Sequence, residues 1–213
     1  MSRDRPRIDY YFSFISLWSY VGGLAFQDLV RRTDAEVTYR PIDLLAVFAA
    51  GGGKPVRERP AQRQAYRLVE MKRWREIRGI PLVLHPRFYP ADPSLGHRMV
   101  LAALERTLDV SGFVHAGLKA VWADELDVAN EATLVRLANE QGLPGEDLLG
   151  EALREPALAE QEAALTREAI DRQLFGAPFY FFRDEPFWGQ DRLDLLERAI
   201  RDRTDAIPFT PVD

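Results

Sequence analysis

Ser16 is the residue of this chain whose type and position most clearly suggest chemistry. It follows an aromatic, strand-like segment, Ile8 to Phe14, and comes just before a segment with the apolar spacing of a helix. The first N–H groups of a helix lack partners within the helix, and its positive dipole end attracts anions. A hydroxyl here could donate to a bound thiolate and lower the pKa of the thiol. The simpler interpretation is that Ser16 caps the helix, but Ser19 competes for that role and would leave Ser16 free.

A second feature is the proline in Phe175-Gly176-Ala177-Pro178-Phe179, which stands directly before another aromatic segment. Because proline cannot donate to a strand ladder, Pro178 could simply mark the entry to a strand. The alternative is a cis Ala177–Pro178 bond, which would turn the preceding backbone groups toward a ligand.

A third feature is the pair Gln190 and Asp191, which follows Trp188 and Gly189 at the start of the last predicted helix. Asp191 could be an ordinary N-cap. Alternatively, Asp191, the Gln190 side chain and the first amides of the helix could together hold the α-ammonium and α-carboxylate of a ligand.

Other kinds of site have no support. The chain has no cysteine, so disulfide exchange is excluded and any sulfur chemistry must come from a ligand. The three histidines are far apart and form neither HxxxH nor HExxH, so we predict no metal site. The patterns GxGxxG and GxSxG and a phosphate loop are also absent.

Length and composition indicate a soluble protein of one large domain or two interleaved ones. The chain has 213 residues, of which 46% are hydrophobic and 29% charged, and no apolar run could span a membrane. The net charge of -5 argues against nucleic acid as a partner, and we interpret the basic residues from Lys54 to Arg78 as the solvated face of a helix. The charged N-terminus does not fit a signal peptide, so we expect a cytoplasmic protein.

The beginning of the chain has a β-α-β pattern. Alternating aromatic residues predict a strand at residues 7–14, helical spacing predicts a helix at 18–32, and β-branched residues predict a strand at 36–40. Such a unit predicts a parallel pair of strands joined by a crossover helix. Residues 41–60 contain several glycines and prolines and are expected to form a long functional loop.

The rest of the chain is a helical stretch followed by a β-β-α pattern. The predicted helices are residues 61–78, 94–107, 111–123, 130–141, 145–154 and 157–174. Strands at 179–182 and 186–188 and a helix at 191–203 follow. This order predicts an α/β thioredoxin-like fold with an inserted all-helical domain. The thioredoxin-like domain would be discontinuous, at residues 1–60 and 174–213, and the inserted domain would be residues 61–173.

Six segments carry a resemblance to a known family. They are Phe12-x-Phe14-x-Ser16-x-x-Ser19-Tyr20, Ile42-Asp43-Leu44, Gln62-Arg63 through Trp74, Gly79-Ile80-Pro81-Leu82, Phe175-Gly176-Ala177-Pro178 and Trp188-Gly189-Gln190-Asp191-Arg192-Leu193. With them, the chain resembles the 2-hydroxychromene-2-carboxylate isomerases from about Ile8 to Arg201. These are similar to kappa-class glutathione transferases and, more remotely, to DsbA-type disulfide oxidoreductases.

The resemblance implies a catalytic serine and a bound tripeptide. Ser16 matches the catalytic serine of the family, and glutathione would be the ligand. The positions implied to bind it are Ser16, Ala177, Pro178, Trp188, Gln190 and Asp191. Ala177 would hold the backbone of the tripeptide as an added strand does, and Gln190 with Asp191 would hold its γ-glutamyl end.

The resemblance also implies a substrate site, and the chain departs from the family there. Lys54 and Tyr89 match substrate-contacting positions. Leu17 stands where the family usually has proline, and Gly52-Gly53 replace an asparagine often found before the loop lysine. These departures bear on the approach to Ser16 and on the identity of the substrate.

Three functions are compatible with these residues. The first is a glutathione-dependent isomerase of aromatic catabolism, acting on 2-hydroxychromene-2-carboxylate or a similar compound. The second is a kappa-like glutathione transferase or peroxidase with the same site. The third is a non-catalytic glutathione-binding module in which Ser16 is only a cap. The resemblance further implies a homodimer.

Overall fold

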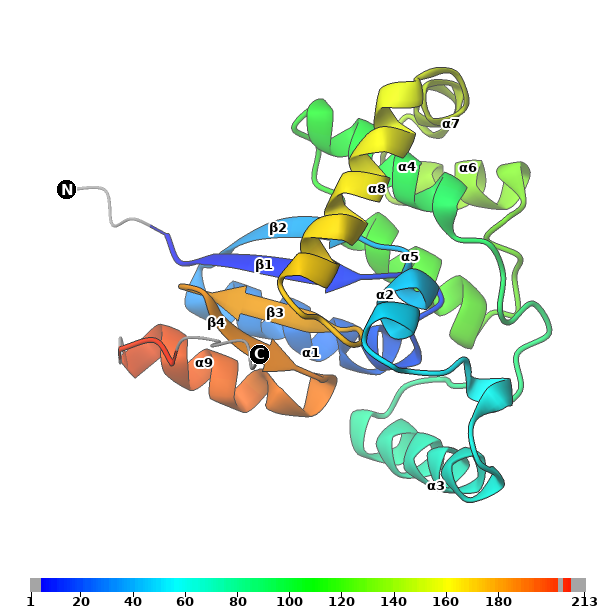
Figure 1. The fold of residues 1–213 in the computed structure, drawn as a ribbon. Coiled ribbons are helices and arrows are strands. Elements are labelled where there is room, and N and C mark those ends of the chain that lie inside the picture. The colour runs from blue at the N-terminus through cyan, green and yellow to red at the C-terminus, as the bar shows by residue number, and fades with distance from the viewer. Residues whose placement is uncertain (1–4, 203–204, 208–213) are drawn as a thin grey trace.

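A mixed four-stranded sheet forms the centre of the molecule. The computed structural model describes residues 5–202 and 205–207. The strands are β1 (Arg7–Phe12), β2 (Glu36–Pro41), β3 (Phe179–Phe182) and β4 (Glu185–Trp188), in the order β2-β1-β3-β4. β1 runs parallel to β2 and antiparallel to β3, which pairs antiparallel with β4. The predicted β-α-β and β-β-α patterns are therefore confirmed (Figure 1).

Nine α-helices lie within the described residues. They are α1 (Leu17–Thr33), α2 (Leu44–Ala50), α3 (Ala61–Arg78), α4 (Ser94–Glu105), α5 (Ser111–Trp122), α6 (Glu131–Glu140), α7 (Gly145–Arg154), α8 (Pro156–Asp171) and α9 (Leu193–Asp202). Two 3-10 helices, η1 (Val56–Glu58) and η2 (Gln190–Arg192), complete the described elements.

The expectation of an uninterrupted loop at residues 41–60 was wrong, because α2 and η1 lie within it. The side chain of Asp43 caps α2 by accepting the N–H groups of Leu45 and Ala46, at 2.9 and 3.1 Å. Leu44 and Val47 are buried on one side of this short helix. A good cap and two buried residues are enough to form a helix that the glycines and prolines around it concealed.

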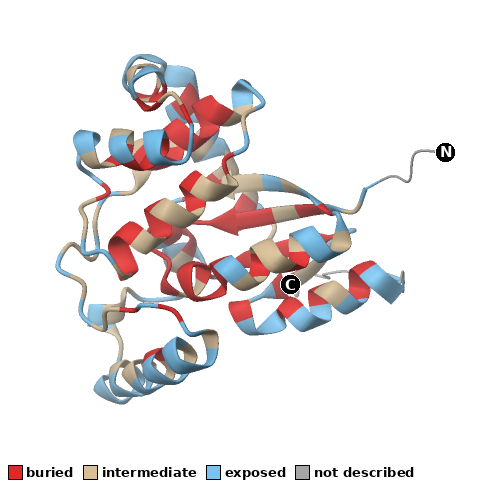
Figure 2. Cartoon of the chain, turned by 180° about the vertical axis from the view of Figure 1, so that it is seen from behind, coloured by how far each residue is buried: buried red, intermediate tan, exposed pale blue. Residues whose placement is uncertain are grey.

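The two faces of the sheet are covered by different helices, because successive side chains of a strand point to opposite faces. Tyr10 and Tyr180 belong to a core shared with α1 and α9. Tyr11, Phe179 and Phe181 form a second cluster with residues of α2 and α8. Figure 1 shows α8 crossing one face of the sheet, and Figure 2 shows α1 and α9 on the other.

Helices α4 to α8 pack on one another, whereas α3 packs against α1 and lies apart from them in Figure 1. One continuous core nevertheless joins the strands to α4–α8. Phe14 is part of this junction, because a Cβ on Gly96 or Gly117 would come within 2.5 or 2.7 Å of its ring. The proposed boundaries of the inserted domain stay a prediction.

Every helix in residues 5–202 is too short or too polar to cross a lipid bilayer. The homodimer and the cytoplasmic location stay predictions.

Candidate functional site

Ser16 caps α1 and also contacts the far end of the chain. Its Oγ accepts the N–H of Ser19 at 3.2 Å and donates to the carbonyl oxygen of Ala177 at 2.9 Å. The residue is 3% exposed. The expectation that Ser19 competes for the cap was wrong, since the extended backbone of Ser16 directly precedes the helix and directs its own hydroxyl back to the first turn. Capping uses a lone pair of the hydroxyl, and its single proton is donated to the carbonyl of Ala177.

Two backbone donors accompany this hydroxyl at the start of α1. The N–H groups of Leu17 and Trp18 bond to no acceptor within residues 5–202. The family that the chain resembles usually has proline at the position of Leu17. Because proline has no N–H, the N–H of Leu17 is an additional donor in this chain. Together with the dipole of α1, these groups favour an anion next to Ser16.

The Ala177–Pro178 peptide bond is cis, the second of the two alternatives that the sequence left open, and both residues are buried. The carbonyl of Ala177 accepts from Ser16, whereas its N–H donates to no group in the described part of the chain. The next residue, Pro178, is held by the segment after β4, because its carbonyl accepts the N–H of Gly189 at 3.0 Å. Ala177 thus offers an unused donor two residues before β3 begins, which suits pairing with an extended ligand.

Gln190 is buried and held by a residue that sequence reasoning missed. Arg78, the last residue of α3, donates from Nη2 to Gln190 Oε1 at 2.8 Å and to its backbone oxygen at 3.2 Å. Gly189 has φ +99°, a conformation that L-residues rarely adopt, and a Cβ there would meet a carboxylate oxygen of Asp191 at 2.6 Å. The turn therefore needs glycine. The turn buries Gln190 and leaves Asp191 exposed, with its Oδ2 2.5 Å from Arg192 Nη1.

Trp188 is half exposed and contacts Phe175, with ring centroids 4.5 Å apart. Its indole nitrogen lies so close to Gly176 that a Cβ there would come within 2.9 Å of it. Trp188 therefore lies against the segment that carries Ala177 and Pro178, as a shared ligand site requires.

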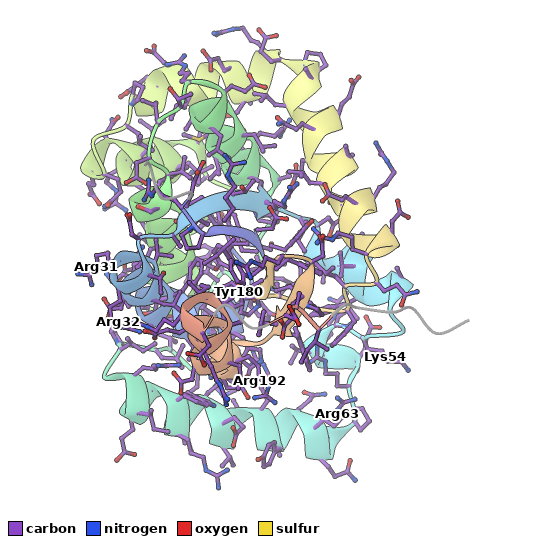
Figure 3. The ribbon with its side chains drawn as sticks, turned by 90° about the vertical axis from the view of Figure 1, so that its left-hand side faces the viewer. Arg31, Arg32, Lys54, Arg63, Tyr180 and Arg192 are labelled. Carbon is purple, nitrogen blue, oxygen red and sulfur yellow. The ribbon has the colours of Figure 1, made fainter. Side chains whose placement is uncertain are left out.

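The structure brings Tyr89 to this site, but it shows no such contact for Lys54. Tyr89 packs on a small cluster formed by Ile15, Leu44 and Ala177. Burial raises the pKa of its phenol, so it is neutral and can donate. Lys54 is exposed on the segment between α2 and η1, and its side chain forms no hydrogen bond or ion pair with another described residue (Figure 3).

His97 is a second residue that sequence reasoning missed, because a lone histidine carries no motif. It is fully buried, and its Nε2 accepts the N–H of Phe14 at 3.2 Å. That bond requires Nε2 to be unprotonated, so Nδ1 carries the proton and donates to Glu162 at 2.8 Å. His97 therefore ties the loop that carries Ser16 to α4 and α8.

No group of three or more His, Asp or Glu side chains is placed to hold a metal ion within the described residues. The site consists of a hydroxyl, backbone donors and a carboxylate, which suits a small ligand that carries both an anionic and a cationic group.

Comparison with known proteins defines the class. The family model of the DSBA-like thioredoxin domain matches residues 7–201. A solved structure described as 2-hydroxychromene-2-carboxylate isomerase superposes with a TM-score of 0.75 at 28% identity, over 92% of this chain and 95% of that one.

Curated relatives narrow the class further. A 2-hydroxychromene-2-carboxylate isomerase of Sphingobium xenophagum is 34% identical over 197 residues, which are 92% of this chain and 98% of the relative. Glutathione S-transferase kappa 1 of Caenorhabditis elegans is 24% identical over 208 residues, and the match covers 92% of this chain and 91% of the relative. The chain belongs to the DSBA-like thioredoxin family and, within it, to the family of the 2-hydroxychromene-2-carboxylate isomerases.

Proposed function

We propose that the protein is a glutathione-dependent isomerase acting on 2-hydroxychromene-2-carboxylate or a similar intermediate of aromatic degradation. The observation that carries this proposal is the Ser16 hydroxyl at the start of α1, 2.9 Å from the carbonyl of Ala177. The names of the relatives support the reaction class.

The tripeptide would bind along Ala177 as an added strand. Its cysteine N–H would bond to the Ala177 carbonyl, and the free N–H of Ala177 would bond to a carbonyl of the tripeptide. Ser16 would then lose its present acceptor and donate to the sulfur instead. With the N–H groups of Leu17 and Trp18 nearby, the thiol pKa falls and more thiolate is present at neutral pH.

The thiolate would act as a covalent catalyst. It adds to an unsaturated carbon of the substrate, the oxygen ring opens, and rotation occurs about the bond that has become single. The sulfur then leaves with its bonding electrons, so glutathione is regenerated and nothing is oxidised or reduced overall. Addition divides one difficult rearrangement into easier steps.

The direct test is an absorbance assay of purified protein with 2-hydroxychromene-2-carboxylate, with and without glutathione. We expect conversion that depends on both protein and glutathione. An unchanged spectrum in both samples contradicts the proposal.

A kappa-like transferase or peroxidase is the second candidate, favoured by the match to the kappa 1 transferase. The same thiolate would displace a leaving group rather than add reversibly. Conjugation of a chlorinated aromatic compound, in a sample that does not convert the chromene, selects this alternative.

Asp191→Asn is expected to weaken glutathione binding about 10-fold, because the exposed carboxylate would hold the α-ammonium of the γ-glutamyl end. Calorimetry measures the affinity. Cysteinylglycine, which lacks that end, should bind the variant and the parent equally. Asp194→Asn, an equally exposed change in α9, is the control, and equal affinities of both variants for glutathione would refute the role of Asp191.

A further inference from the structure

The turn that carries Ser16 is held from outside the sheet by His97, a residue of α4. The N–H of Ser16 donates to the carbonyl of Ser13 at 2.8 Å, which closes a tight turn directly after β1. Inside this turn, the N–H of Phe14 donates to Nε2 of His97 at 3.2 Å, and the rings of these two residues lie 5.3 Å apart. His97 therefore holds both the backbone and the side chain of the residue two positions before Ser16.

Burial makes this contact costly to lose. Phe14 and His97 are both 0% exposed. A backbone N–H that loses its acceptor at such a depth is left unpaired, which costs free energy comparable to a whole hydrogen bond. The turn is therefore strongly favoured at the one position where His97 can accept from it.

Glu162 determines the hydrogen-bonding role of His97. Its Oε1 lies 2.8 Å from Nδ1 of the imidazole, and its side chain is only 12% exposed. A carboxylate can only accept, so it keeps the proton of the imidazole on Nδ1 and leaves the lone pair of Nε2 facing Phe14. In the opposite tautomer, the Nε2–H and the N–H of Phe14 would be two donors facing each other.

Glu162 is itself well placed to hold the turn, because the following part of α8 is tied to the chain at β1 and after β2. Oγ1 of Thr166, one turn beyond Glu162, accepts the N–H of Asp43 at 3.0 Å. Oε1 of Glu168 accepts the hydroxyl of Tyr11 in β1 at 2.6 Å. The α8 helix thus gives the His97 contact a fixed position relative to the sheet.

We propose that His97 and Glu162 are positioning residues of the reaction, which hold the Ser16 hydroxyl toward the sulfur bound at the start of α1. This inference rests on the proposed function and adds two residues to it. They act through the N–H of Phe14, and His97 itself is fully buried. The position of the turn decides where the hydroxyl lies, and a misplacement of about 1 Å between reacting groups can cost roughly 100-fold in rate.

The test compares catalysis with the binding of a ligand that has no thiol. S-methylglutathione keeps the tripeptide but cannot form a thiolate. We expect His97→Leu to lower kcat about 10- to 100-fold and to raise the pKa of the thiol in bound glutathione, measured from its ultraviolet absorbance. Calorimetry should show an unchanged affinity for S-methylglutathione. His97→Gln keeps an amide oxygen that can accept the N–H of Phe14, so it should recover most of the lost kcat.

Glu162→Gln repeats the test at a residue that is only partly buried, where folding is less at risk. An amide can offer Nδ1 a donor as well as an acceptor, so the tautomer of His97 is no longer determined. We expect kcat to fall about 10-fold. Glu160→Gln, an exposed change two residues earlier in α8, is the matched control and should keep the kcat of the parent. If His97→Leu does not fold, Glu162→Gln decides the question.

Two results overturn the inference. One is a normal kcat and a normal thiol pKa in His97→Leu and Glu162→Gln. The other is an equal loss of kcat and of S-methylglutathione affinity without recovery in His97→Gln, which would give His97 a general structural role only. If the parent lowers the thiol pKa but does not convert the chromene, the proposed reaction fails and the positioning role stands. An ordinary thiol pKa in the glutathione complex of the parent contradicts both.

Discussion

Ser16→Ala is expected to lower isomerase turnover at least about 100-fold, the usual effect of removing one donor that stabilises a reacting charge. Without the hydroxyl, the bound thiol keeps a higher pKa and less thiolate is present. The variant also loses its cap, which costs about 1 kcal/mol of stability. Turnover is measured with 2-hydroxychromene-2-carboxylate, and the thiolate is followed by its ultraviolet absorbance in the bound tripeptide.

Ser19→Ala is the matched control for this experiment. Ser19 lies in the same turn and is equally buried, but its Oγ has no hydrogen-bond partner within the described residues. It should keep most of the turnover. If Ser16→Ala folds, binds glutathione and turns over at a normal rate, Ser16 is only a cap and its proposed role in stabilising the thiolate is wrong.

Phe14→Ala is expected to reduce the free energy of unfolding by about 3–5 kcal/mol, the range for a large aromatic residue truncated in a core. Phe14 is fully buried and lies against Phe113 and His97, with ring centroids 5.9 and 5.3 Å away. Gly96 and Gly117 approach its ring so closely that a Cβ on either would come within 2.5 or 2.7 Å of it, and neither has a side chain that could fill the space left by the ring. Urea unfolding followed by circular dichroism measures the loss.

Leu24→Ala, at a site that is 46% exposed, gives the comparison for truncation of an apolar side chain. It should cost less than about 1 kcal/mol. An equal loss of unfolding free energy in the two variants would contradict this prediction, because it would mean that the Phe14 ring contributes no more to stability than an exposed leucine. Because the His97 ring that accepts the Phe14 N–H also packs against the Phe14 ring, we expect Phe14→Ala to lower turnover as well, by loosening the Ser16 loop.

Local patterns account for most of the predicted fold. The alternation of residues from Ile8 to Phe12 predicted the strand β1. The helical spacing of α3 ended before Gly79, whose φ of +60° is the left-handed conformation that often ends a helix. The α2 helix was missed because it is only seven residues long, and its cap and buried residues are visible only once its partners are known. Short helices depend on tertiary packing more than on their own propensity.

The site was predictable only in part. Ser16 and the cis bond before Pro178 had local signals, namely a strand-to-helix turn and a proline before a strand. Arg78 and His97 had none, since their partners Gln190 and Phe14 are distant in sequence. The basic residues of α3 were interpreted as a solvated face, but some of them line a cavity, because helix periodicity does not show what lies opposite a face.

By itself, the sequence determined the strands and most of the helices, the serine at the start of a helix and the absence of any cysteine, because these depend on residue type and local spacing. Only the tertiary structure decided that Ser16 donates to Ala177, 161 residues away, and that Arg67 lies beside Tyr89. The physical reason is that contacts between distant segments depend on how the helices pack around the sheet. A single sequence contains the residues for those contacts but does not state their pairing.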